Sequence, residues 1–501
     1  MNPKLEKFIQ EVKDKNIHIA GLSGSEGAAV AQFLVRCGVN QVVGHDFQAK
    51  ETFKKGFYQA HTSLSPKDRQ RAFKDLLNLP ITIRFQEEYL KDILEADLIF
   101  TGQNWFNYPA NYPHLLKAKE KGLPFSNITQ LYLRLAPGPV VGITGTKGKT
   151  TTGNLLLKIL NSRTPESKQA SKAYLSGNDR TRPQILNVLG EMKTDDILIL
   201  EISNRQLTDL GRSPHIGVLT NISADHIEEH GSFDAYRRVK GSLFSHQTRK
   251  DWAVINYDDP FAREIGSRLS SKVFPYSRQF RFTDRGVFIE EDHPKLGTPL
   301  ETRRGKVVAV RDGASEVLFE ANDLRLIGGH NLENALAAAS AAKLLGVEVE
   351  AIKAGIKTFQ GVKGRLEFVR EVAGVRYYND MSSTTPASTM AALKALSGEP
   401  IILIAGGDEK GGNYAELARV IKEKVKRVVF LPGTATDRLK IYLSDFGYLE
   451  ASDLSTAVKY TLDMAVLGDT VLLSPAGARF ASQYVTDKEG FSRLIRKIAN
   501  R

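Results

Sequence analysis

A glycine-rich turn at residues 145–152 carries the side chains best suited to bind the phosphates of a nucleotide. It follows an apolar, β-branched run at 140–143 and precedes a segment with helical apolar spacing at 154–160. In such a strand–turn–helix unit the glycines let the backbone approach a phosphate, and the N–H groups at the helix N-terminus point toward it. The Lys149 ammonium then suits the β- and γ-phosphates, and the Thr150 hydroxyl suits Mg²⁺.

The turn has the form Gly-Thr-x-Gly-Lys-Thr. The longer phosphate-loop pattern is incomplete, because Ile143 stands five residues before Gly148, where that pattern has glycine. A glycine turn with exposed lysines and no ligand is the alternative, but the strand before the turn and the helix after it favour a nucleoside triphosphate. The candidate nucleotide-binding residues are Gly145, Thr146, Lys147, Gly148, Lys149, Thr150 and Thr151.

Three further side chains with metal- or charge-binding chemistry follow this turn. Glu201 ends an apolar run at 197–200, and a carboxylate at the end of a parallel strand suits Mg²⁺. His226 follows another strand end, within reach of a second metal, and Lys240 lies on a predicted helix. Taken alone, the loop at Asp225 and His226 is explained as well by helix capping, and Lys240 is explained as well by exposure to solvent. The order of these residues along the chain, after the phosphate turn, makes the assignment of the set to a metal site more specific.

The elements that must position these residues fall into three blocks of alternating strands and helices, and residues 134–139 are predicted to form a linker. The first block opens with a strand at 17–20, a glycine-rich turn, a helix at 28–37 and a strand at 41–44. This order suits a nucleotide diphosphate at the helix N-terminus. The candidate substrate contacts in this block are Ser23, Gly24 and Asp46.

Continuously apolar runs at 197–200 and 216–220 are typical of a parallel sheet that is buried on both faces. Short alternating strands between 280 and 326 predict an antiparallel excursion, and the last block again alternates strands and helices. The predicted fold is therefore α/β with three domains. They are a Rossmann-like domain at 1–137, a central P-loop ATPase-type domain with a mostly parallel sheet at 138–361, and a second Rossmann-like domain at 362–501.

The composition is that of an ordinary globular protein, with 42% hydrophobic and 25% charged residues among 501. A single cysteine, Cys37, excludes a disulfide framework within the chain. No apolar run approaches the roughly 20 residues that span a bilayer, and no signal peptide is recognisable at the N-terminus. The net charge of +12 is spread along the chain without a basic tract. We expect a cytoplasmic monomer that binds neither nucleic acid nor membranes.

Taken in order, the motifs resemble those of the ATP-dependent Mur ligase family over essentially the whole chain. They lie at residues 145–152, 201–207, 220–226, 236–240, 329–335, 364–367, 378–380, 406–410 and 473–476. The resemblance implies that ATP converts a substrate carboxylate to an acyl phosphate, which an amine then attacks. It also implies two Mg²⁺ ions and a CO₂-derived carbamate on Lys240.

The resemblance assigns a role to each matched residue. The catalytic residues would be Lys149, Glu201, His226 and Lys240, and the metal ligands Thr150, Glu201, His226 and Lys240. Further ATP contacts would come from Asn334, Arg365 and Asp380. Further substrate contacts would come from Asn178, Ser203, Gln206, Thr384, Lys410 and Arg479.

Within the family, the turn at 406–410, the segment at 473–476 and the short first domain most resemble the branch that adds D-glutamate to UDP-N-acetylmuramoyl-L-alanine in peptidoglycan synthesis. The residues around the incoming amino acid depart from that branch. The segment 363–365 lacks the family histidine, 380–385 lacks a lysine, and Arg479 replaces a serine. A ligase that adds L-glutamate or another amino acid to a related precursor is one alternative. An ATP-switched binding protein that does not ligate is another.

We predict that Lys410 and Arg479 both bind carboxylates of the incoming amino acid, because a guanidinium pairs bidentately with a carboxylate. Arg479→Ala should then raise KM for glutamate far more than KM for ATP in steady-state kinetics. The alternative is that Arg479 is an exposed residue with no ligand. Equal activity with glutamate and alanine in the unmutated protein would contradict the prediction.

Overall fold

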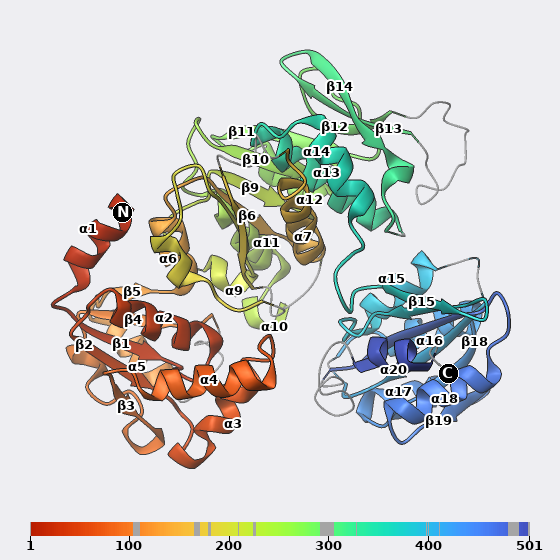
Figure 1. Cartoon of the computed structure of the whole chain (residues 1–501), viewed down its shortest axis with the longest axis horizontal. Helices are drawn as coiled ribbons and strands as arrows, with labels where there is room; N and C mark the ends of the chain where they lie inside the picture. The colour runs from red at the N-terminus through yellow and green to blue at the C-terminus, as the bar shows by residue number, and fades with distance from the viewer. Residues whose placement is uncertain are drawn as a thin grey trace. The chain divides into compact units, whose positions relative to one another are not determined.

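A computed structural model describes residues 2–103, 111–164, 171–178, 182–208, 210–223, 227–290, 305–326, 328–396, 398, 400–409, 411–478 and 490–498. Its strands form three sheets, each with flanking helices, which confirms the predicted α/β class (Figure 1). The chain divides into two compact units. The first two sheets lie in the unit that begins at the N-terminus, and the third lies in the unit that ends at the C-terminus. No helix among the described residues is long and apolar enough to cross a membrane.

The first sheet is parallel throughout, in the order β3-β2-β1-β4-β5. The strand order reverses between β1 and β4, and open α/β sheets bind ligands at such a switch point. The predicted strand–turn–helix–strand unit is confirmed, although its helix begins earlier, at Ser25. The strands are β1 (Asn16–Ala20), β2 (Gln41–His45), β3 (Thr82–Arg84), β4 (Leu98–Thr101) and β5 (Phe125–Ser126), and the helices are α1 (Pro3–Val12), α2 (Ser25–Arg36), α3 (Lys50–Ala60), α4 (Pro66–Leu77), α5 (Tyr112–Glu120) and α6 (Ile128–Leu135).

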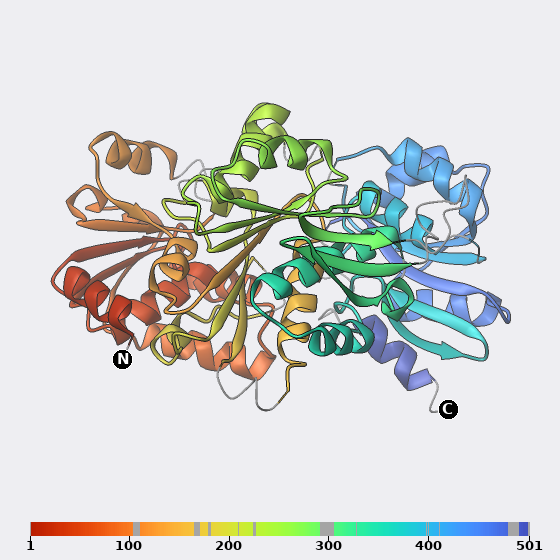
Figure 2. The ribbon, with the colours of Figure 1, turned by 90° about the horizontal axis from the view of Figure 1, so that it is seen from above.

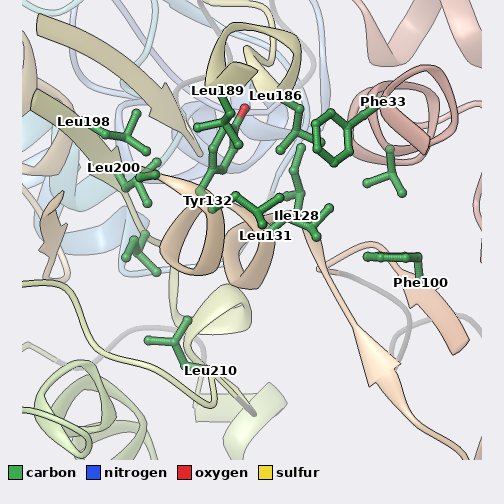
Figure 3. Close-up of a cluster of buried hydrophobic side chains, with 14 of the residues drawn as sticks. Phe33, Phe100, Ile128, Leu131, Tyr132, Leu186, Leu189, Leu198, Leu200 and Leu210 are labelled. Atoms are coloured by element: carbon green, nitrogen blue, oxygen red, sulfur yellow. The ribbon is translucent and has the colours of Figure 1, made fainter. Parts of the chain in front are cut away.

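The predicted linker at 134–139 is wrong at its start, because α6 continues through Leu135. Leu131 and Tyr132 of α6 are buried in the core that the first two sheets share, between phenylalanines of the first sheet's side and leucines of the second sheet's side (Figure 3). The side-chain amide of Asn2 donates to the Leu135 carbonyl over 2.7 Å, which satisfies an acceptor at the end of the helix. Tertiary burial therefore extends the helix, and only residues 136–139 connect α6 to the second sheet.

The second sheet has the order β14-β13-β12-β11-β10-β9-β6-β8-β7. Neighbours from β7 to β12 are parallel, and β12, β13 and β14 pair antiparallel, which confirms the predicted excursion (Figure 2). Every residue of β6, β8 and β9 is buried, as expected for strands covered on both faces. The strands are β6 (Val140–Thr144), β7 (Ala173–Gly177), β8 (Ile197–Glu201), β9 (Ile216–Leu219), β10 (Trp252–Asn256), β11 (Lys272–Ser277), β12 (Arg285–Glu290), β13 (Lys306–Arg311) and β14 (Ala314–Glu320), and the helices are α7 (Lys149–Leu160), α9 (Asn204–Leu207), α10 (Ile227–His230), α11 (Phe233–Gly241), α12 (Pro260–Gly266), α13 (Gly329–Leu344) and α14 (Val349–Thr358).

The third sheet has the order β15-β16-β20-β17-β18-β19 and is parallel except for the edge pair β15–β16. The alternation of strands and helices predicted for this block is confirmed. The boundaries of the three predicted domains stay a prediction. The strands are β15 (Glu367–Val372), β16 (Val375–Asn379), β17 (Ile401–Gly406), β18 (Val425–Phe430), β19 (Tyr448–Glu450) and β20 (Thr470–Ala476), and the helices are α15 (Pro386–Ala395), α16 (Tyr414–Lys424), α17 (Thr434–Tyr442), α18 (Leu454–Met464) and α20 (Gly490–Ile498).

Two buried histidines of the first sheet are hydrogen-bonded to each other, with 2.9 Å between His45 Nε2 and His18 Nδ1. His45 Nδ1 accepts the backbone N–H of Leu90 over 3.1 Å, so the proton of His45 sits on Nε2 and is donated to His18. Burial, with the Arg84 charge as a lesser cause, lowers the pKa of His18 to about 4. Burial, with His18 and Arg84 as lesser causes, lowers the pKa of His45 to about 3. Both rings are therefore neutral at pH 7.

In the unfolded chain each of the two histidines binds a proton below the ordinary histidine pKa of 6.5, whereas in the folded chain both stay neutral to a lower pH. The contribution of the neutral pair to the free energy of unfolding is therefore fully present above pH 6.5. This stabilisation is lost as the pH falls from 6.5 through about 4 for His18 and about 3 for His45, at about 1.4 kcal/mol for each unit of pKa difference. Urea unfolding across this range should show the loss. His18→Asn keeps an acceptor for His45 but does not titrate, so it should flatten the pH dependence. His114→Gln, at an exposed histidine, should not change it. An unaltered dependence in His18→Asn would contradict the account.

Candidate active site

The phosphate turn connects β6 to α7, and two of its glycines are required by the backbone and by their neighbours. Gly145 has a φ of 146° and Gly148 a φ of 88°, a region that side chains disfavour. A Cβ on Gly145 would lie 2.0 Å from Thr220 Oγ1, and one on Gly148 would lie 2.3 Å from Asn334 Oδ1. The glycines therefore allow the residue after β9 and the start of α13 to pack directly against the turn.

Asn221 holds the turn in shape. Its Oδ1 accepts the backbone N–H of Lys147 over 2.9 Å, and its Nδ2 donates to the Lys147 carbonyl over 3.1 Å. The Asn221 carbonyl also accepts the N–H of Thr146 over 2.9 Å. These contacts form because β9 lies next to β6, with Leu219 opposite Thr144. Asn221 lies inside a matched motif but was not among the predicted site residues, because its partner is identified only by the strand order.

Three predicted ATP-site residues, Lys149, Thr150 and Thr151, lie at the start of α7. Lys149 Nζ donates to the carbonyls of Gly145 and Thr146, over 2.8 and 3.1 Å, so the ammonium lies within the turn. Thr150 is buried in the first turn of the helix. Asn334 of α13 accepts a hydrogen bond from the Thr152 hydroxyl over 3.3 Å, so it lies against the same turn.

Glu201, at the end of β8, offers an oxygen that suits a cation. β8 pairs with β6 so that Glu201 lies opposite Ile143, just before the phosphate turn. Its Oε1 accepts a weak hydrogen bond from Asn178 Nδ2 over 3.4 Å. Its Oε2 is buried and has no hydrogen-bond partner in the described part of the chain. A buried carboxylate oxygen without a partner is unfavourable unless a cation binds there, and Mg²⁺ prefers such oxygens. The residues present therefore fit a magnesium ion.

Lys240 is not exposed, so the explanation of this residue as a solvated lysine is wrong. It lies on α11, as predicted, and only 1% of it is accessible. Its Nζ is 3.4 Å from Thr144 Oγ1 and 5.2 Å from the ring centre of Tyr236. The Tyr236 hydroxyl lies 3.1 Å from Thr146 Oγ1 in the phosphate turn. The fold therefore brings a buried lysine to the base of the turn. His226, Lys410 and Arg479 lie outside the described residues.

In the first sheet, Asp46 shapes the turn that follows β1. Its Oδ2 accepts the N–H of Ser23 over 2.7 Å, and its Oδ1 accepts the N–H of Gln48 over 3.1 Å. Burial raises the pKa of Asp46, and the hydrogen bonds from Ser23 and Gln48 partly oppose this. Ser23 and Gly24 therefore stand in a fixed turn beside the switch point. Contact of these residues with a substrate stays a prediction.

The C-terminal unit has a polar group of its own at the end of β16. Asp380 accepts hydrogen bonds from the Ser474 hydroxyl over 2.8 Å and from the N–H of Leu366 over 3.0 Å. Burial raises the pKa of Asp380 to about 6, against the opposing effect of these bonds and of the Arg365 charge. Thr384 lies just beyond, in the segment before α15. The unit thus brings the predicted residues Arg365 and Asp380 together.

Two models of Mur ligase domains match this chain. Residues 143–342 match the Mur ligase middle domain, and residues 364–477 match the Mur ligase glutamate ligase domain. The chain is 34% identical to the UDP-N-acetylmuramoylalanine--D-glutamate ligase of Caldanaerobacter subterraneus subsp. tengcongensis, over 93% of this chain and 94% of the relative. This chain belongs to the Mur ligase family. A ligase of the same name from Pelotomaculum thermopropionicum is 37% identical, over 94% of each chain.

Solved structures of the Mur ligase family share the fold. The UDP-N-acetylmuramate-alanine ligase of Thermotoga maritima has a TM-score of 0.58 at 17% identity, over 97% of this chain and 100% of that one. The MurF ligase of the same organism, in complex with ADP, has a TM-score of 0.55 at 17% identity, over 98% and 97%. The family models and the curated relatives confirm the predicted family, the resemblance to its D-glutamate-adding branch, and the ligase class. The roles of individual site residues stay predictions.

Lys149→Ala should lower turnover of this Mur ligase by several orders of magnitude, because the ammonium acts mostly on charge that develops in the transition state. Lys158→Ala, in the last turn of the same helix, provides a matched loss of one lysine away from the turn and should stay close to the unmutated rate. Both variants should melt normally. If Lys149→Ala kept activity within about tenfold, a loss of no more than ~1.4 kcal/mol, the phosphate-site assignment would be wrong.

Proposed function

We propose that this protein joins the carboxylate of UDP-N-acetylmuramoyl-L-alanine to the amine of D-glutamate, with cleavage of ATP to ADP and phosphate, in the synthesis of peptidoglycan precursors. The observation that carries the proposal is the convergence of three groups at one edge of the central sheet. These are the phosphate turn with Lys149, the carboxylate of Glu201 with a buried oxygen that no described residue hydrogen-bonds, and the buried Lys240. The names of the two relatives support the choice of substrates.

The chemistry explains why such a set of groups is needed. A carboxylate is a poor electrophile, so one of its oxygens first attacks the γ-phosphorus of ATP, and the bond to ADP breaks. The amine then attacks the carbonyl carbon of the acyl phosphate, and phosphate leaves with that oxygen. Positive charge and aligned N–H groups at the phosphates stabilise the first transition state. Lys149 and the N-terminus of α7 supply both.

Thr150 and Glu201 would hold one Mg²⁺, and His226 would help to hold a second. When bound, the ions neutralise charge on the phosphates. We assign a carbamate to Lys240. The ammonium first loses one proton, and the neutral amine then adds to the carbon of CO₂ and loses a second proton, so a buried cation becomes an anion able to orient a metal. The near-complete burial of Lys240 beside Thr144 supports this assignment.

The remaining contacts divide between the two ends of the chain. The turn after β1, with Ser23 and Gly24, and the turn after β4 would bind the UDP part of the substrate at the switch point of the first sheet. The C-terminal unit would supply Arg365 and Asp380 to ATP, and Thr384, Lys410 and Arg479 to the amino acid. A reaction that consumes ATP and a nucleotide-linked precursor fits the cytoplasm. We expect the protein to act as a monomer.

A substrate panel tests the proposal directly. ADP release by the purified protein should require both UDP-N-acetylmuramoyl-L-alanine and D-glutamate, and mass spectrometry should show one amide product. L-glutamate and alanine serve as matched amino acids, and UDP-N-acetylmuramate serves as the matched acceptor without the alanyl carboxylate. Faster reaction with L-glutamate would favour the alternative amino acid. ATP hydrolysis without either substrate would favour a nucleotide-switched binding protein.

Lys240→Ala should be inactive, because the buried anion is lost together with the lysine. Short carboxylic acids such as formate or acetate should restore part of the activity by occupying the place of the carbamate. Lys250→Ala, at an exposed lysine, should keep full activity and should not respond to these acids. Full activity of Lys240→Ala without added acid, or a lysine mass without CO₂ in the active protein, would count against the carbamate.

A further inference from the structure

A closed ring of hydrogen bonds links the first sheet to the second. Glu26, in the first turn of α2, accepts the backbone N–H of Gln103 on Oε2 over 3.0 Å and the side-chain amide of Gln206 on Oε1 over 2.9 Å. The Ser203 hydroxyl donates to the side-chain oxygen of Gln103 over 2.8 Å. The ring closes through Gln206 Oε1, which accepts the N–H of Ser203 over 3.0 Å.

The members of this ring come from the two parts of the proposed site. Gln103 lies in the turn after β4, at the switch point of the first sheet. Ser203 and Gln206 form a capping box at the start of α9, two residues beyond Glu201. Glu26, Ser203 and Gln206 are all buried, with 8%, 7% and 2% of each residue accessible. A buried carboxylate that accepts two hydrogen bonds is a strong and directional link.

The ring also forms one wall of a cavity of about 240 Å³. Glu26, Gln103 and Gln206 line it, together with Arg205 and the start of α6. A group bound in this cavity therefore meets a surface whose shape depends on the ring. Both amide atoms of Gln206 and both carboxylate oxygens of Glu26 are already hydrogen-bonded, so these two side chains are fixed before any ligand arrives.

We infer that Glu26 is a positioning residue that holds the substrate-side turn at Gln103 and the helix after Glu201 in a fixed relation. The inference rests on the proposed function, because it takes the turn at Gln103 as part of the UDP-substrate site. Glu26 acts through Gln103 and Gln206, and it sets how the UDP-linked substrate presents its carboxylate to the phosphate turn. The ATP contacts do not depend on the ring, because Asn221 holds the phosphate turn separately.

An exchange of the two side chains across the ring tests this role. In Glu26→Gln, two amide groups face each other as donors, and in Gln206→Glu, two carboxylates face each other as acceptors. In the double variant, the amide of residue 26 donates to the new carboxylate while its oxygen still accepts the N–H of Gln103. The new carboxylate still accepts the N–H of Ser203. Every hydrogen bond of the ring is therefore restored, with the charge moved to the other partner.

Each single variant should raise KM for UDP-N-acetylmuramoyl-L-alanine by about tenfold or more, the effect of losing one buried hydrogen bond with its partner left unsatisfied. KM for ATP should stay within about twofold, since the ATP contacts are separate. The double variant should lower the KM for the UDP-linked substrate at least about threefold below that of either single variant, and because residue 206 is also a predicted substrate contact, the ring does not require full recovery. Leu76→Ala, a fully buried leucine of α4 outside the ring, lowers the stability of the same region and should leave both KM values unchanged.

Thermal unfolding of all four variants separates folding from positioning. If a single variant does not fold, the folded double variant decides the question by its KM. Single variants with unchanged KM for the UDP-linked substrate, or a folded double variant as impaired as the single ones, would overturn the inference. An unmutated protein that makes no amide from these substrates would instead overturn the proposed function. In that case a double-mutant cycle on thermal stability, which measures the interaction energy between the side chains of residues 26 and 206, still tests the hydrogen-bonded ring itself.

Discussion

The adjacency of β6, β8 and β9 at the centre of the second sheet is the constraint on which the site depends. Their register places Glu201 opposite Ile143 and Leu219 opposite Thr144, so all three strands end at the same edge. The phosphate turn, which follows β6, therefore lies beside the Glu201 carboxylate at the end of β8 and beside Asn221 just after β9. Close packing of the differently shaped side chains buried on both faces of the sheet holds this register.

Local chemistry explains which parts of the site were predictable from the sequence. The phosphate turn is continuous in the chain, and Glu201 follows an unbroken apolar strand, so residue type and position sufficed for both. The hydrogen bonds of Asn221 to the phosphate turn and of Glu26 to Gln206 could be identified only from the fold, because the partners lie 74 and 180 residues apart in the sequence. The start of the linker was predicted wrongly for the same reason. Its Pro and Gly residues are local signals, but the burial of Leu131 and Tyr132 that extends α6 is tertiary.

Buried polar groups are what distinguish the site from the surrounding core. Three polar groups of the candidate site are buried: one oxygen of Glu201, the amine of Lys240 and the carboxylate of Asp380. In the protein interior a charge without a partner is unfavourable. In the C-terminal unit, hydrogen bonds from Ser474 and Leu366 compensate Asp380. At the phosphate turn the described residues leave one oxygen of Glu201 uncompensated. This difference favours the phosphate turn, rather than the surroundings of Asp380, as the site that binds a cation and phosphates.

We propose that ATP activates the acceptor by phosphorylating its carboxylate. A heavy-oxygen label placed in both oxygens of the alanyl carboxylate of UDP-N-acetylmuramoyl-L-alanine follows this step. If an acyl phosphate forms and the amine of D-glutamate displaces phosphate, each released phosphate carries one labelled oxygen, and the amide keeps the other. Mass spectrometry of phosphate and product should show this transfer. Two results would contradict this mechanism: amide formed while the released phosphate carries no label, or unlabelled phosphate released without any amide product.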